Sequence, residues 1–252
     1  TMIEVYKKRL TTADWLAKET RDKAIVKLNV ITPHIGYPEK LPETYAKKII
    51  DESLSLVENA RNLAKISIAH SWSKWNQPVD RSEWHMPAHM VNAYYDPQQN
   101  QIVFPAAILQ APFYDYKADA AVNFGGIGAV IGHELSHGFD DSGSQYDGNG
   151  NLNNWWTSED RAKFDKAADA LVAQFETYEP VPGVFVNGRF TLGENIGDLG
   201  GSSVAFDALK MYLQDKGNPG KIDGFTPEQR FFLSWATIWR TKTTDEFVIN
   251  QV

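Results

Sequence analysis

The sequence predicts a helix-rich α+β fold. Several long stretches place apolar residues at helical spacing, and one pair of β-rich runs flanks a polar turn. The composition, with 42% hydrophobic and 23% charged residues over 252 positions, is that of a globular protein able to bury a sizeable core. Disordered, collagen-like and coiled-coil proteins are therefore excluded.

The N-terminal third is expected to be helical. The chain enters a helical pattern at once, and Thr12 or Asp14 is the predicted N-cap of a helix over residues 15–29. The sequence 35–38 (Ile-Gly-Tyr-Pro) breaks this helix, and Pro42 with Glu43 opens a long amphipathic run that continues to Ile68. We expect residues 1–78 to form a helical segment that leads into a core spanning residues 79–252.

The rest of the chain mixes a hairpin with marked helices. Residues 90–95 and 101–105 are β-rich and flank a polar turn, which predicts a β-hairpin. One helix is expected from Asp119 to about residue 139, and another is expected to begin within 193–198 and to continue through Tyr212. Capping signals at Thr157 and at Thr226-Pro227-Glu228-Gln229 predict two more helices.

Charge and cysteine content narrow the possible functions. With 25 Lys+Arg against 32 Asp+Glu, the net charge of −7 argues against nucleic acid as a partner. No run of 18 apolar residues occurs, so we expect no membrane contact by this segment. Because the chain has no cysteine, a metal ion would have to be bound by His, Asp and Glu.

A short motif suggests such a metal site. His133 and His137 are four residues apart in a predicted helix, so their imidazoles share one face, with Glu134 beside them. This is the H-E-x-x-H arrangement of zinc enzymes. The alternative is a solvated helix that carries two histidines by chance, but the preceding turn, residues 128–132, is too apolar for that interpretation.

A catalytic zinc site needs a third protein ligand. The best candidates are Glu194 and Asp198, again four residues apart at the start of a predicted helix. One carboxylate could bind the metal while the other accepts the spare ring N–H of a histidine ligand. Paired acids at this spacing also occur simply as solvated charge, and the residues alone leave both interpretations open.

Three motifs together resemble the neprilysin and endothelin-converting enzyme family, which includes bacterial oligopeptidase O. They are residues 133–141 (HELSHGFDD), 193–198 (GENIGD) and 91–95 (VNAYY). Further similarity extends over nearly the whole chain, at residues 35–38, 124–128, 155–156 and 231–239.

The resemblance implies a thermolysin-like (gluzincin) catalytic lobe and a role for each matching residue. His133, His137 and Glu194 would bind one Zn²⁺, with Glu134 as general base. Asp198 matches an aspartate described in the family as a proton donor, although its position favours orienting a histidine.

The same resemblance implies a substrate site. Asn92 and Ala93 match the residues that bind the substrate backbone at an edge strand. The hydrophobic pocket for the side chain that follows the scissile bond matches five positions, most of which would also suit plain core: Phe113, Ala129, Val130, Ile238 and Trp239. The implied function is a zinc-dependent endopeptidase that hydrolyses short peptides on the amino side of bulky hydrophobic residues.

The chain departs from the family at both ends. Family members carry a His and an Arg soon after the helix that matches residues 229–239, and no histidine follows His137 here. We therefore expect a fragment whose partners are peptide substrates, the family's N-terminal helical region and its C-terminal segment. Two alternatives are a catalytically incomplete fragment that binds zinc or peptide, and a nonenzymatic helical interaction module.

Weaker signals complete the predictions. The absence of cysteine favours a bacterial cytoplasmic protein, although a preceding signal would make it extracytoplasmic. Residues 147–151 are interpreted as a polar turn rather than a calcium loop. Four histidines outside the motif are interpreted as structural or surface residues: His34, His70, His85 and His89. Asp140 and Asp141 are equally compatible with orienting a ligand and with solvated charge.

Overall fold

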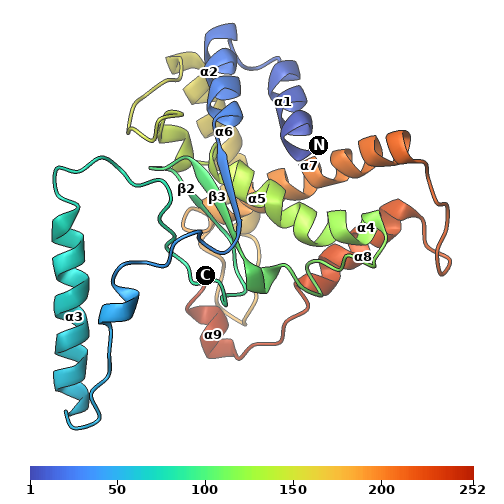
Figure 1. Cartoon of the computed structure of the whole chain (residues 1–252). Helices are drawn as coiled ribbons and strands as arrows, with labels where there is room; N and C mark the ends of the chain where they lie inside the picture. The colour runs from blue at the N-terminus through green and yellow to red at the C-terminus, as the bar shows by residue number, and fades with distance from the viewer.

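A computed structural model describes residues 1–252 as a small sheet among nine helices (Figure 1). The strands are β1 (Thr32–Gly36), β2 (Tyr94–Asp96) and β3 (Gln101–Pro105). The helices are α1 (Met2–Thr12), α2 (Lys18–Asn29), α3 (Leu56–Ser73), α4 (Ala120–Asn123), α5 (Ala129–His137), α6 (Ser158–Phe175), α7 (Leu192–Lys216), α8 (Pro227–Ile238) and α9 (Asp245–Ile249). This confirms the predicted helix-rich α+β class.

The sheet has the order β1-β3-β2. The antiparallel pair of β2 and β3 is the predicted hairpin, although its first strand is shorter than expected. β1 pairs in parallel with β3, from Thr32 opposite Gln101 to Gly36 opposite Pro105. Residues 35–38 were expected only to break a helix, but Ile35 and Gly36 belong to β1, because pairing with the distant β3 makes a strand of a segment that contains Pro and Gly.

The centre of the molecule is the crossing of α5 and α7 (Figure 1). Their backbones touch, because a Cβ atom on Gly132 would lie 2.6 Å from the Gly201 carbonyl oxygen. Apolar clusters pack on both sides of this crossing. One includes Leu135 with Ile102 and Phe104 of the sheet, and another includes Leu209 and Phe231.

The helix predicted from Asp119 to about residue 139 is interrupted. Asp119 caps α4, since its carboxylate accepts the Ala121 N–H at 2.9 Å. A wider turn then follows over residues 124–128, with non-helical dihedral angles at Gly126, before α5 begins. Beyond this bend, α5 packs against α7.

Side-chain caps begin several helices. Thr157 caps α6 and Thr226 forms a capping box with Gln229 at α8, as predicted. The prediction for α2 was wrong: its N-cap is Ala17, whose N–H donates to both carboxylate oxygens of Asp160 on α6, whereas Thr12 ends α1. A tertiary contact here replaces a local cap.

Helix α3 projects from the body of the molecule (Figure 1). The amphipathic run that opens at Pro42 becomes an α-helix only at Leu56, where Ser55 and Glu58 form a capping box. Many of its apolar side chains are exposed, among them Leu56, Ile68 and Trp72. No helix of the structure has both the length and the apolar character needed to cross a membrane.

Elements from both sides of residue 78 share one core. Val5 of α1 packs with Val204 and Ala208 of α7, and Leu28 of α2 packs with residues of β3 and α5. The division between residues 1–78 and 79–252 stays a prediction.

Candidate metal centre

Two helices bring three possible metal ligands together. His133 and His137 lie one turn apart on α5, and Glu194 lies in the first turn of α7. The Nε2 atom of His133 is 3.3 Å from one carboxylate oxygen of Glu194, and that of His137 is 3.8 Å from the other. One ligand atom from each residue falls within 4.8 Å of the other two. The structure thus brings together the three residues that were predicted to bind the metal.

Each histidine is oriented by a second carboxylate. Asp198, one turn beyond Glu194, lies 2.8 Å from His133 Nδ1, and Asp140 lies 2.7 Å from His137 Nδ1. An aspartate that accepts the Nδ1–H leaves the Nε2 lone pair of the same ring free to bind a metal. The position of Asp198 therefore supports the orienting role that its spacing suggested.

The sequence left the role of Asp140 open, and the structure gives it several contacts. Its side chain is buried, and its second oxygen accepts the backbone N–H groups of Ser142 at 2.9 Å and Gly143 at 2.6 Å. Asp141 makes no such contact with a histidine, and its Oδ1 is buried without a partner. The position three residues after His137 was the only sequence signal for Asp140.

The electrostatics of the site favour a positive charge between these groups. Burial acts to lower the pKa of His133, but its hydrogen bonds to Asp198 and Glu194 outweigh burial and raise that pKa to about 10. The same balance, with Asp140 as the partner, raises the pKa of His137. The contact with His133 lowers the pKa of Glu194. Carboxylates that stabilise an imidazolium at this position would also stabilise a divalent cation.

Glu134 has the environment of a tuned acid or base. Its side chain is buried, one carboxylate oxygen has no hydrogen-bond partner, and it lies beside both histidines on α5. Burial raises the pKa of Glu134 to about 7. A carboxyl group whose pKa lies near neutrality can both accept and return a proton.

The residues present fit a zinc ion. Two imidazole nitrogens and one carboxylate oxygen form a donor set typical of catalytic zinc, which needs an open fourth position. The three candidate ligands and Glu134 all line one cavity of about 370 Å³. His133, His137 and Glu194 could therefore hold this metal.

The edge strand forms one wall of the same cavity. Asn92 and Ala93, just before β2, line it together with Tyr95 and the ligand residues. The side-chain oxygen of Asn92 accepts the Ala93 N–H at 2.9 Å, which leaves the Asn92 amide nitrogen available. The predicted backbone-binding pair thus lies beside the metal ligands, at the free edge of β2.

The five residues predicted to form one hydrophobic pocket lie in different surroundings. Phe113, Val130 and Ile238 meet in one apolar cluster, whereas Ala129 is fully buried in another. The side chain of Trp239, at the end of α8, is half exposed. None of the five lines the cavity that holds the ligands.

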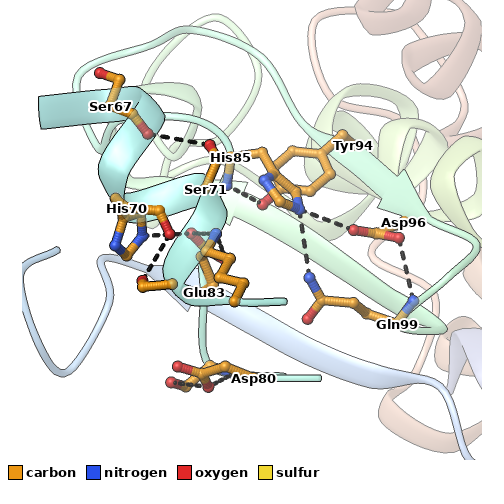
Figure 2. A network of polar contacts seen from close by, with 12 residues as sticks. Ser67, His70, Ser71, Asp80, Glu83, His85, Tyr94, Asp96 and Gln99 are labelled. Atoms are coloured by element: carbon orange, nitrogen blue, oxygen red, sulfur yellow. Dashed lines mark hydrogen bonds and ion pairs between the residues drawn. The ribbon is translucent and has the colours of Figure 1, made fainter. Parts of the chain in front are cut away.

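Two of the remaining histidines, His85 and His70, contact residues elsewhere in the fold. His85 Nε2 lies 3.0 Å from Asp96 Oδ2, and the His85 backbone N–H donates to the Tyr94 hydroxyl (Figure 2). His70 approaches Glu83, which also pairs with Lys74. These contacts tie the segment before β2 to the strand and to α3. Residues 147–151 form a turn in which the Asp147 carboxylate accepts the N–H groups of Asn149 and Asn151.

The fold and the ligand geometry define a thermolysin-like metallopeptidase lobe, and comparison with known proteins identifies the family. The sequence model of peptidase family M13 matches residues 92–252, and the N-terminal model of the same family matches residues 1–38. The chain belongs to peptidase family M13.

Individual relatives agree with this assignment. The chain is 61% identical over 210 residues, 83% of its length, to a putative zinc metalloproteinase of Streptococcus gordonii. Over 98% of its length it is 46% identical to the neutral endopeptidase of Lactococcus lactis. It spans only 37% of the length of each of these relatives.

Solved structures give the same result. The crystal structure of Mycobacterium tuberculosis zinc metalloprotease ZMP1 in complex with an inhibitor matches 99% of this chain, with a TM-score of 0.92 and 47% identity. The crystal structure of PepO from Lactobacillus rhamnosis matches 98% of it, with a TM-score of 0.88 and 39% identity. In both cases the match covers 38% of the solved chain.

Proposed function

We propose that this chain is the metal-bearing part of a zinc-dependent endopeptidase, with His133, His137 and Glu194 as the zinc ligands. The observation that carries the proposal is the convergence of these three side chains beside the buried carboxylate of Glu134, one oxygen of which has no hydrogen-bond partner. Membership of a family whose named relatives are zinc metalloproteinases and neutral endopeptidases supports it.

In this proposal Glu134 is the general base. A bound zinc ion supplies Lewis acidity, which makes water more acidic and polarises the scissile carbonyl group. Glu134 takes the proton from the attacking water and passes it to the leaving amine, a transfer for which a pKa of about 7 is well placed. Asp198 and Asp140 hold the two imidazoles with Nε2 toward the ligand position.

The substrate would be an extended short peptide. β2 is an edge strand, so a peptide can add to it through main-chain hydrogen bonds. Asn92 and Ala93 would bind main-chain groups next to the scissile bond, since they line the cavity beside Glu134.

We further propose cleavage on the amino side of bulky hydrophobic residues. Val130 lies one turn before His133, and it packs with Phe113 and Ile238 in an apolar cluster. This cluster, with the half-exposed Trp239, would border the pocket for the side chain after the scissile bond.

Further polypeptide segments are proposed partners. The matched relatives are much longer than this chain, and the apolar side chains of α3 are largely exposed. Segments equivalent to the remaining parts of the relatives would cover such surface and restrict access to the cavity.

Two substitutions test the proposal. Glu134→Gln should retain zinc but lower peptide cleavage about a hundredfold or more, because only the base is removed. Glu194→Val should abolish stoichiometric zinc binding, because it removes a ligand. Elemental analysis of this chain measures the metal, and a fluorogenic peptide assay on the longest polypeptide that carries it measures cleavage. Normal cleavage by the first variant, or full zinc occupancy of the second, would refute the assignments.

A further inference from the structure

Lys27 of α2 is an unusual lysine because it is almost completely buried. Its side chain is 1% exposed, and its ammonium group donates hydrogen bonds of 2.7 Å to the backbone carbonyl oxygens of Gly143 and Tyr146. A charged side chain is rarely buried this deeply unless its contacts compensate for the lost hydration.

Three aromatic rings surround the same ammonium group. The nitrogen lies 5.6 Å from the ring centre of Phe139 and 5.9 Å from those of Tyr95 and Trp155. Such distances allow cation–π attraction. Burial lowers the pKa of Lys27 to about 8, although the carboxylates of Asp140 and Asp147 act to raise it. The two carbonyl oxygens and the three ring faces thus offset part of the hydration that the buried ammonium group loses.

The carbonyl groups that Lys27 binds belong to the turn over residues 140–146, which connects directly to the metal centre. Asp140 begins this turn, and it accepts the N–H groups of Ser142 and Gly143 with one oxygen and contacts His137 Nδ1 with the other. Ser142 and Gly143 also line the cavity. The path from Lys27 to His137 thus consists of Gly143 and Asp140 alone.

The backbone of Lys27 is connected through Asn100 to another residue that lines the cavity, Tyr95. The Asn100 amide donates to the Lys27 carbonyl oxygen at 3.2 Å, and the Asn100 side-chain oxygen accepts the Tyr95 hydroxyl at 2.8 Å. Tyr95 lines the cavity as well. One residue of α2 is therefore connected both to the 140–146 turn and to Tyr95.

We propose that Lys27 is a positioning residue of the metal centre, whose ammonium group fixes the 140–146 turn and through it the orientation of His137. The inference rests on the proposed zinc site. A lysine that serves only to fill the core would stabilise the fold without influencing the metal ligands, and this difference can be measured.

The test compares Lys27→Met with Lys23→Met in the 252-residue chain. Methionine retains much of the length of the lysine side chain but removes both donated hydrogen bonds. Lys23 is a matched control on the same helix, because its side chain is 47% exposed and pairs with Glu19. Zinc affinity is measured by competition with a chromophoric chelator, and ligand geometry by the visible absorption of bound Co²⁺. Unfolding of the metal-free proteins by urea is measured separately.

We expect Lys27→Met to bind zinc about tenfold more weakly than wild type and to alter the Co²⁺ spectrum, because loss of an outer contact typically weakens metal binding by 10- to 100-fold. Lys23→Met should change neither. If Lys27→Met unfolds more easily but binds zinc with wild-type affinity and an unchanged Co²⁺ spectrum, the positioning role is refuted and the zinc site stands. If wild type binds no zinc, the proposed metal site fails, and the role of Lys27 fails with it.

A second measurement applies if Lys27→Met does not fold. In wild type labelled with ¹⁵N-lysine, zinc should shift the side-chain resonance of Lys27 and leave that of Lys23 in place. An unperturbed Lys27 resonance at zinc saturation would overturn the proposal.

Discussion

Replacing Asp140 with Asn would test how the orientation of His137 controls metal binding. One oxygen of Asp140 accepts two backbone N–H groups, and the other faces His137 Nδ1 at 2.7 Å. In Asp140→Asn the amide oxygen can keep the backbone bonds, so the NH₂ group faces Nδ1. The imidazole must then accept at Nδ1 and carry its proton on Nε2, the atom that should bind the metal.

The structure sets the size of two separate effects. The two backbone bonds lose their charge assistance, which is worth about 0.5–2 kcal/mol each, so the free energy of unfolding should fall by about 1–4 kcal/mol. Zinc affinity should fall about 10- to 100-fold because the tautomer is wrong. Asp198→Asn should reproduce the loss of affinity through His133, whose Nδ1 lies 2.8 Å from Asp198.

Calorimetric zinc titration and urea unfolding of the metal-free protein measure the two effects independently. Asp141→Asn is the matched control, because Asp141 is the next residue and contacts neither histidine. Its zinc affinity should equal that of wild type. Unchanged affinity in Asp140→Asn would show that Asp140 does not determine the tautomer of His137.

Two further predictions concern His133. A Cβ atom on Gly197 would lie 2.8 Å from the His133 ring, so Gly197→Ala should displace the imidazole. Zinc binding should weaken about tenfold in a calorimetric titration. Wild-type affinity would contradict the close packing of Gly197 on His133. In the metal-free protein, burial acts to lower the pKa of His133. Its hydrogen bonds to Asp198 and Glu194 outweigh burial and raise this pKa to about 10, above the unfolded value of about 6.5. The contribution of protonated His133 to the free energy of unfolding should be complete below pH ~6.5 and fall by about 1–2 kcal/mol by pH ~8, as measured by urea unfolding. A free energy of unfolding that rises over this range would contradict the prediction.

The elements that were predicted well are those with local signals. The hairpin follows from two β-rich runs around a polar turn, and α8 follows from the capping box at Thr226. β1 could not be predicted, because residues 32–36 become a strand only by pairing with β3. The start of α3 was predicted too early, although Ser55 and Glu58 carry the spacing of a capping box.

In the candidate site, too, the residues with a local sequence signal were predicted, and those placed by tertiary contacts were not. The convergence of His133 and His137 depends on helical spacing alone, and the family resemblance selected Glu194 from two equivalent acids. The choice between Asp140 and Asp141 depends on how the chain leaves α5, which no local pattern specifies. Lys27 could not be recognised, because a lysine in a polar helix normally indicates a solvated face.

The contact between Gly132 and Gly201 determines what can disturb this site. The spacing between the histidine helix and the glutamate helix is fixed by main chain against main chain, with no side chain between them at that point. Conservative changes in the flanking apolar clusters should therefore alter stability before they alter the ligand spacing. The spacing of the candidate metal ligands thus depends on this main-chain contact more than on the exact packing of the hydrophobic core.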